Sequence, residues 1–320
     1  MPAIEVRALT KRFRVPVRGS GLAAALGSLL RRSYDVIEAI RDLSFAVDKG
    51  EMISLLGPNG AGKTTTLKLL AGLLFPTGGE VSVLGHTPWR RPKEYLRQIS
   101  MVLGNKSQLT WDIPARDSFE VLREIYRVPR DAYRRTSTEL IDLLDAGALL
   151  AKPVRTLSLG ERMKCELIAA FLHRPRLVFL DEPTLGLDVT MQRRLRDFIA
   201  ERNADGVTVL LTSHYMADVQ ALCRRVLLVD EGRLLFDGML DDLSARVAPF
   251  KLLTVTTRTP LPATRVLRST DQELALRVER ESVARVTGAL IERLSPTDLK
   301  VEDPPIEDVL DRVYGRGERP

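Results

Sequence analysis

One eight-residue segment constrains the fold of this 320-residue chain more than any other part. It reads Gly57-Pro58-Asn59-Gly60-Ala61-Gly62-Lys63-Thr64 and fits the pattern G-x-x-x-x-G-K-[ST]. An apolar run from Met52 to Leu56 precedes it, and a helical pattern from Thr65 to Leu74 follows it. A strand before and a helix after are the context that a phosphate-binding loop requires. The segment therefore predicts an α/β fold with a phosphate-binding loop.

The residue types in this loop are suited to holding a nucleotide triphosphate. Glycines let backbone N–H groups curl around phosphate oxygens, and the helix N-terminus adds a partial positive charge. Lys63 can reach the β- and γ-phosphate oxygens, and Thr64 can ligate Mg²⁺. A simple glycine-rich turn is the alternative, and the flanking strand and helix count against it. The predicted nucleotide-binding residues here are Gly57, Pro58, Asn59, Gly60, Ala61, Gly62, Lys63, Thr64 and Thr65.

A second apolar strand, Leu177 to Leu180, ends in two carboxylates, Asp181 and Glu182. Charge at the end of a buried strand is costly unless something compensates it. Asp181 is compensated if it lies near a Mg²⁺ held by Thr64, and Glu182 can then polarise the attacking water as a general base. An ordinary acidic turn is the alternative, which the phosphate loop elsewhere in the chain makes less favoured.

The wider pattern predicts a large domain over residues 1–238 and a smaller one after it. Apolar runs alternate with helical periodicity from about Ile4 to Leu235, which indicates a mostly parallel sheet covered by helices. Residues 109–155 are helical and charged, and we expect an inserted helical subdomain there. The other expected strands are Val207–Thr212 and Val226–Val229 in the main sheet, and Ile4–Leu9, Leu43–Val47 and Glu80–Leu84 in a small antiparallel sheet, with a hairpin turn at Asp230-Glu231-Gly232-Arg233.

Two segments lie outside this core pattern. Residues 14–35 carry leucines at helical spacing among arginines and predict an inserted basic amphipathic helix, packed either on its own domain or against a membrane or partner. Residues 239–320 predict a linker near 239–250 and a small α+β accessory domain. Its expected elements are strands at Lys251–Thr257 and Glu273–Val278 and helices at Glu281–Leu294 and Ile306–Tyr314.

Composition excludes several classes of protein. The chain is 44% hydrophobic and 28% charged, which is typical of a globular protein and not of a disordered one. Its apolar runs are shorter than the roughly 20 residues that a membrane-spanning helix needs. The net charge is +6, but aromatic residues make up only 5%, so no nucleic-acid partner is expected. Two cysteines, Cys165 and Cys223, fit a reducing cytosol.

A third motif, Thr156-Leu157-Ser158-Leu159-Gly160-Glu161, opens a helix shortly before the acidic strand. In this order the motifs resemble the ATP-binding cassette (ABC) ATPases. The resemblance implies a P-loop NTPase fold with a RecA-like parallel core, an antiparallel β subdomain and an inserted helical subdomain. The resemblance implies that Ser158 and Gly160 meet the γ-phosphate bound by the opposite subunit. It also implies a metal-sensing glutamine at Gln108 and a switch histidine at His214 that contacts the γ-phosphate. Leu185-Gly186-Leu187-Asp188 is similar to the family's dimer-contacting loop.

The resemblance leaves two local questions open. The family stacks adenine on an aromatic residue after the first strand, which is Phe13 here, with Tyr34 as the alternative because of the insertion that begins at Arg14. The common signature has glycine where this chain has Leu159 and glutamine where it has Glu161. Glu161 therefore places a negative charge near a tetraanionic ligand.

The family resemblance also implies how the chain works. Two cassettes, as a homodimer or a heterodimer with a second ABC ATPase, would sandwich two Mg-ATP and power separate integral membrane permease subunits from the cytoplasmic face of the membrane. Residues 107–118, 157–163 and the tail 304–310 resemble the export branch akin to daunorubicin-resistance ATPases. The alternatives are an ABC importer ATPase and a non-transport ABC ATPase of translation or DNA repair.

Overall fold

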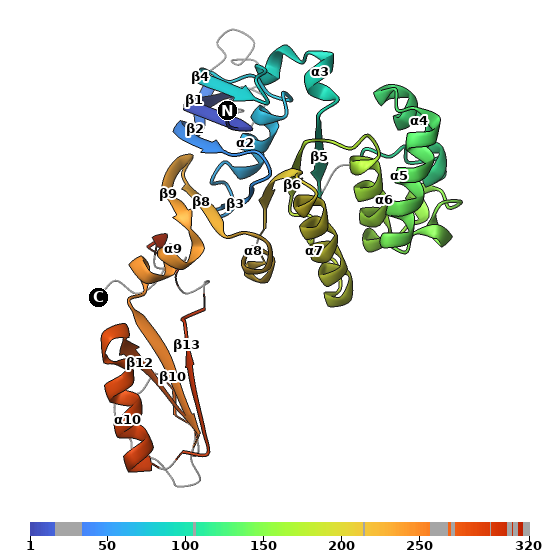
Figure 1. Cartoon of the computed structure of the whole chain (residues 1–320). Helices are drawn as coiled ribbons and strands as arrows, with labels where there is room; N and C mark the ends of the chain where they lie inside the picture. Colours follow the sequence, from blue (N-terminus) through green and yellow to red (C-terminus); the bar gives the residue numbers. More distant parts are fainter. Residues whose placement is uncertain are drawn as a thin grey trace, which may run out of the picture. The chain divides into compact units, whose positions relative to one another are not determined.

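The structure is a computed structural model that describes residues 1–16, 34–104, 107–213, 215–256, 268–269, 273–294, 296–305, 309 and 313–315. The chain divides into two compact units, Met1–Asp237 and Gly238–Pro320 (Figure 1). No helix among the residues described is both long enough and apolar enough to cross a membrane.

A six-stranded sheet forms the centre of the first unit. Its order is β5-β6-β7-β3-β8-β9, and its four pairings from β5 to β8 are parallel. Every residue of β6 and β7 is buried, as expected for parallel strands covered on both faces. The strands are β3 (Met52–Leu56), β5 (Ile99–Leu103), β6 (Leu177–Asp181), β7 (Thr208–Thr212), β8 (Arg225–Asp230) and β9 (Arg233–Met239).

The turn between β8 and β9 has only two residues, Glu231 and Gly232. Their φ angles are 44° and 77°, as a two-residue hairpin turn with two left-handed residues requires. This confirms the predicted hairpin. Arg225 reinforces the pair, since its guanidinium donates to both carboxylate oxygens of Asp237 at 2.7 and 2.8 Å and to Glu51 at 3.0 Å.

The second sheet of this unit has the order β2-β1-β4 and is antiparallel. Its strands are longer than the sequence pattern predicted: β1 is Ile4–Pro16, β2 is Tyr34–Val47 and β4 is Gly78–Val83. The expectation of a helix over 14–35 is therefore wrong at both ends of that segment. Phe13, Val15, Val36 and Ile37 are aromatic or β-branched and extend the β1–β2 ladder instead. Residues 17–33 lie outside the described part of the chain.

The inserted helical subdomain, green in Figure 1, contains α4 (Ala115–Tyr126), α5 (Arg130–Leu143) and the start of α6 (Leu159–Phe171). Its two ends meet, because Pro114 and Pro153 form a β-bridge. The other helices of the unit are α2 (Lys63–Leu70), α3 (Lys93–Leu96), α7 (Val189–Ala204), α8 (Met216–Leu222) and the short 3₁₀ turns Pro88–Arg90, Gly147–Leu149 and Val154–Thr156.

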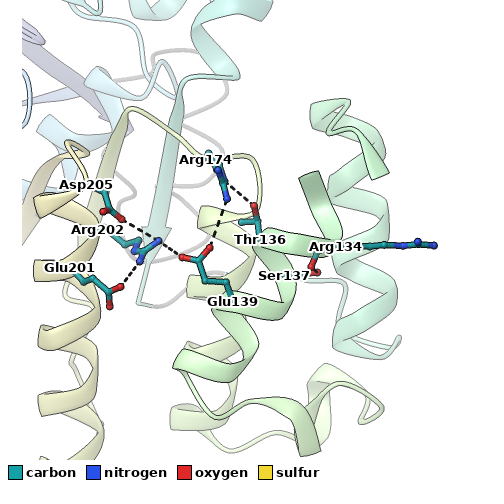
Figure 2. Close-up of polar contacts among 8 residues, drawn as sticks. All are labelled: Arg134, Thr136, Ser137, Glu139, Arg174, Glu201, Arg202 and Asp205. Atoms are coloured by element: carbon teal, nitrogen blue, oxygen red, sulfur yellow. Dashed lines mark hydrogen bonds and ion pairs between the residues drawn. The ribbon is translucent and has the colours of Figure 1, made fainter. Parts of the chain in front are cut away.

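An ion-pair cluster joins the helical subdomain to the core. Figure 2 shows Arg202 of α7 and Arg174 turned toward Glu139 of α5. Arg202 donates to Glu139 at 2.7 Å and lies 3.4 Å from Asp205, while Arg174 donates to Thr136 at 2.9 Å. Because the side chain of Arg202 is only 14% exposed, these carboxylates offset the cost of burying its charge.

The second unit is an α+β fold. Its antiparallel sheet has the order β11-β12-β10-β13, and Leu253 and Val255 of β10 are fully buried. The predicted terminal helix over 306–314 lies mostly outside the described residues. The elements are α9 (Leu240–Val247), β10 (Phe250–Thr256), β11 (Arg268–Ser269), β12 (Glu273–Glu279), a 3₁₀ turn (Arg280–Ser282), α10 (Val283–Leu294) and β13 (Asp298–Glu302).

Candidate functional site

The G-x-x-x-x-G-K-T segment connects β3 to α2 and curls around a small cavity of about 170 Å³. Seven consecutive residues, Asn59 to Thr65, line this cavity together with Ala39 of β2 and Glu182, which follows β6. The cavity lies at the carboxyl edge of the parallel strands, where open α/β sheets bind their ligands. The loop and the first turn of α2 line it, and the N-terminus of a helix suits an anion.

Close backbone packing makes glycine necessary at two positions beside the cavity. At Gly62, with φ of 105°, a Cβ would lie 2.6 Å from the carbonyl oxygen of Ala39, and at Gly232 it would lie 2.8 Å from the same atom. Gly232 also accepts a bond from Arg41 N at 2.8 Å and donates to Ala61 O at 3.1 Å. The β8–β9 turn thus supports the loop. Sequence analysis identified this turn but not its contact with the loop.

Lys63 is buried inside the loop. Its side chain donates to the carbonyl oxygens of Gly57 at 2.6 Å and Pro58 at 3.0 Å. Burial lowers the pKa of its ammonium group, whereas the nearby carboxylates of Glu182 and Asp181 raise it. The ammonium is therefore close to two acids and can exchange its carbonyl partners for phosphate oxygens.

Thr64 and Asp181 lie in direct contact although 117 residues separate them. The Thr64 hydroxyl donates to the Asp181 carboxylate, 2.9 Å from its nearer oxygen, and the Thr212 hydroxyl donates to the other oxygen at 2.8 Å. The residue Asp181 is only 8% exposed. A hydroxyl and a carboxylate at the mouth of a phosphate loop are hard oxygen donors of the kind that Mg²⁺ prefers.

Glu182 follows Asp181 in a left-handed backbone conformation, with φ of 53°. This conformation is uncommon for a residue other than glycine. The Glu182 N–H donates to the carbonyl oxygen of Thr212 at 3.1 Å, which holds this turn against β7. The turn places Glu182 in the lining of the phosphate-loop cavity.

Gln108 lies apart from this group. Its side-chain amide donates to Met101 O at 3.0 Å, and its backbone N–H donates to Glu166 at 3.0 Å. The described residues that line the phosphate-loop cavity do not include it. His214 lies outside the described residues. Just before it, Ser213 donates to the buried Asp218 at 3.1 Å.

The predicted signature opens α6 with a capping box. Ser158 accepts a bond from Glu161 N at 3.3 Å, and the Glu161 carboxylate accepts one from Ser158 N at 2.8 Å. These bonds, together with Lys152 at 3.3 Å, lower the pKa of Glu161. The negative charge that departs from the family pattern is thus paired within its own subdomain. Ser158 and Gly160 do not line the phosphate-loop cavity of their own chain, as far as the described residues show.

Leu159, the other departure, packs on the loop after the acidic strand. A Cβ at Gly186 would lie 2.4 Å from the Leu159 side chain, and a Cβ at Gly160 would lie 3.6 Å from Leu187. Asp188 ends this loop by capping α7, since it accepts a bond from Met191 N at 2.9 Å. The signature and the Leu185–Asp188 loop therefore touch within one chain.

The pairing register of β1 and β2 indicates which of the two candidate aromatic residues, Phe13 or Tyr34, lies nearer to the phosphate-loop cavity. Phe13 pairs with Ile37, which is two residues from Ala39 in the cavity lining, whereas Tyr34 pairs with Pro16. At about 3.4 Å per residue, Tyr34 lies roughly 17 Å along the strand from Ala39. The register favours Phe13, whose ring lies 4.9 Å from the Lys11 ammonium.

Comparison with known proteins agrees with this geometry. The family model described as ABC transporter matches residues 40–185. The ABC transporter ATP-binding protein NatA of Bacillus subtilis is 33% identical over 208 residues, which are 65% of this chain and 85% of NatA. A daunorubicin resistance ATP-binding protein of Streptomyces coeruleorubidus is 29% identical over 292 residues, 88% of this chain and 92% of the relative.

A solved structure of the ATP binding subunit of an ABC transporter has the same fold. It superposes with a TM-score of 0.64 at 28% identity and covers 76% of this chain and 92% of its own. The expected P-loop NTPase fold, with its parallel core and antiparallel and helical subdomains, is confirmed. The chain belongs to the ABC transporter family, as one of its ATP-binding, ATP-hydrolysing subunits.

Proposed function

We propose that this chain hydrolyses Mg-ATP in a pair of cassettes and thereby powers export through separate permease subunits at the cytoplasmic face of a membrane. The observation that carries the catalytic part is the position of Lys63, Thr64 and Glu182 in the lining of one cavity. Asp181 adjoins this group, because it accepts a hydrogen bond from Thr64. These four groups from two distant motifs provide a cation, two oxygen donors and a candidate base at the same edge of the sheet.

Each group has a distinct role in this proposal. Lys63 leaves the carbonyl groups of Gly57 and Pro58 and binds the β- and γ-phosphate oxygens. The Thr64 hydroxyl and Asp181 hold Mg²⁺, which neutralises charge on the phosphates when it is bound. Glu182 orients the attacking water and accepts its proton.

The pairing of cassettes is supported by the position of the signature. Ser158 caps α6 and does not line the described part of its own phosphate-loop cavity. A second cassette, either another copy of this chain or a related ATPase, would bring its signature to this cavity and receive this chain's signature in return. In this proposal Gln108 would act at the metal, and His214 would contact the γ-phosphate.

Export is supported by the relatives. The chain aligns over 88% of its length with a protein named for daunorubicin resistance. The permease would be a separate polypeptide, and the transported substrate would be chosen there.

The catalytic proposal is tested with Glu182→Gln. This variant should bind ATP with wild-type affinity and lose at least about 100-fold in turnover, because a positioned general base contributes about that factor. It should also accumulate as an ATP-bound dimer in analytical ultracentrifugation. Glu94→Gln, at an exposed position of α3, is the matched control and should behave as wild type. Normal turnover by Glu182→Gln would remove Glu182 as the base.

A further inference from the structure

A buried carboxylate on α6 has no part in the chemistry described so far. Glu166 is 3% exposed, and both of its oxygens face the segment that contains Gln108. Oε1 accepts a bond from the Ser107 hydroxyl, and Oε2 accepts one from Gln108 N at 3.0 Å. The carboxylate therefore holds the backbone of the segment at Gln108 itself.

Burying this carboxylate costs free energy, and the hydrogen bonds from Ser107 and Gln108 offset that cost. Burial raises the pKa of Glu166, whereas bonds from Ser107 and from the backbone of Gln108 and Leu109, together with the charge of Arg162, lower it. The groups that face Glu166 thus come from two elements, the segment 107–109 and α6.

Further contacts continue from this anchor toward the signature. The guanidinium of Arg162 lies 5.9 Å from the centroid of Trp111, and Arg155 N donates to Trp111 O at 3.0 Å. Arg155 also forms an ion pair with Asp112 at 2.8 Å. Segment 107–112 therefore lies against both α6 and the turn that leads to Ser158.

We infer that Glu166 is a positioning residue that couples the Gln108 segment to the signature at the start of α6. This inference rests on the proposed function, in which Gln108 serves the ATP of its own chain and Ser158 serves the ATP of the second chain. A displacement of Gln108 must either carry α6 with it or break the bonds of the carboxylate. Glu166 thereby links the two ATP sites of the dimer.

The test measures communication between sites in the full-length protein. For two coupled sites the Hill coefficient of ATP hydrolysis approaches about 2, and without coupling it is about 1. Glu166→Ala should lower the coefficient toward 1. Glu166→Gln should retain most of the coupling, because its amide oxygen can still accept from Gln108 N and its NH₂ can donate to the Ser107 hydroxyl. Glu120→Ala, on α4 beside Arg123, is the matched control.

A second readout follows the contact segment directly. The chain has two tryptophans, so Trp89→Phe leaves Trp111 as the sole indole reporter. In this background ATP should change the emission of Trp111, which is 50% exposed and beside Arg162. The added change Glu166→Ala should abolish the response, whereas Glu120→Ala and Glu166→Gln should preserve it.

The outcomes are separable. A Hill coefficient and a Trp111 response of wild-type size in Glu166→Ala would overturn the coupling by Glu166. If Glu166→Ala does not fold, Ser107→Ala decides, because it removes one bond to the carboxylate and should lower the coefficient measurably; a wild-type value there overturns the inference. A wild-type coefficient of about 1 would likewise overturn the coupling. Absence of an ATP-bound Glu182→Gln dimer in analytical ultracentrifugation would instead contradict the paired cassettes of the proposed function.

Discussion

At the scale of single residues, the first prediction concerns the proposed phosphate-binding role of Lys63. Its ammonium is the only side-chain cation among the described residues that line the loop cavity. We expect Lys63→Ala to weaken ATP binding by about 100-fold, since charged hydrogen bonds contribute about 1.5–3 kcal/mol each. Isothermal titration calorimetry measures this affinity, with Lys68→Ala, later on the same helix, as the control. An unchanged dissociation constant would contradict the role of Lys63 in phosphate binding.

His173 provides a prediction on pH. Its ring stacks on Tyr126 at 3.8 Å, it donates to Ile99 O at 3.0 Å, and burial lowers its pKa to about 4. In the unfolded chain its pKa is about 6.5, so between these values only the unfolded chain takes up the proton. The free energy of unfolding should therefore fall as pH drops below about 6.5, by about 2 kcal/mol from this residue at pH 5.

Urea unfolding at pH 7.5 and pH 5 measures this effect. His173→Phe retains a ring to stack on Tyr126 but cannot take up a proton, so it should lose less stability than wild type over the same interval. Equal losses in the two proteins would show that other groups account for the acid sensitivity.

At the scale of elements, the contact between the signature and the Leu185–Asp188 loop explains how Leu159 is tolerated. Gly186, with φ of 73°, leaves room for the leucine side chain. Gly186→Ala should destabilise the protein by about 1–3 kcal/mol through strain and overpacking. The double variant Gly186→Ala with Leu159→Gly should recover the overpacking part, which thermal unfolding can measure. No recovery in the double variant would mean that the two residues do not interact.

The sequence predicted the elements whose patterns are strong and missed those that depend on distant partners. Strands β3, β6, β7 and β8 follow continuous apolar runs, and their predicted positions are confirmed. Strand β5 was missed because it is short and Ser100 interrupts its apolar pattern. Its parallel pairing with β6 stabilises it as a strand. The outer halves of β1 and β2 were missed because arginines and leucines beyond them dominated the periodicity.

The candidate site shows the same division. Motif spacing predicted the phosphate loop and the acidic strand. The structure brings Thr64 and Glu182 to one cavity, and Thr64 donates a hydrogen bond to Asp181. Glu166 and Gly232 escaped notice because a carboxylate on a helix and a glycine in a turn are ordinary in sequence. Glu166 holds a segment 58 residues away in the sequence, at Gln108. Gly232 packs closely on the backbone of Ala39, which lines the phosphate-loop cavity.

At the scale of the whole molecule, the prediction concerns partners. When the chain is tagged in its native host and membranes are solubilised gently, a polytopic membrane protein should co-purify in stoichiometric amount. The reason is that the chain belongs to the ABC transporter family and resembles ATP-binding subunits of that family. Mass spectrometry identifies the partner, and the fold of that partner distinguishes export from import. Recovery with ribosomes or nucleic acid instead would contradict the transport proposal while leaving the ATPase chemistry intact.

The support that Gly232 gives the phosphate loop sets the minimal length of a nucleotide-binding fragment. Every family motif ends by residue 214, so a fragment cut after Asp230 would retain all of them. It would nevertheless lose the bond from Gly232 to Ala61 and the pairing of Arg225 with Asp237. A fragment built for ATP-binding studies therefore has to extend through β9, to Met239.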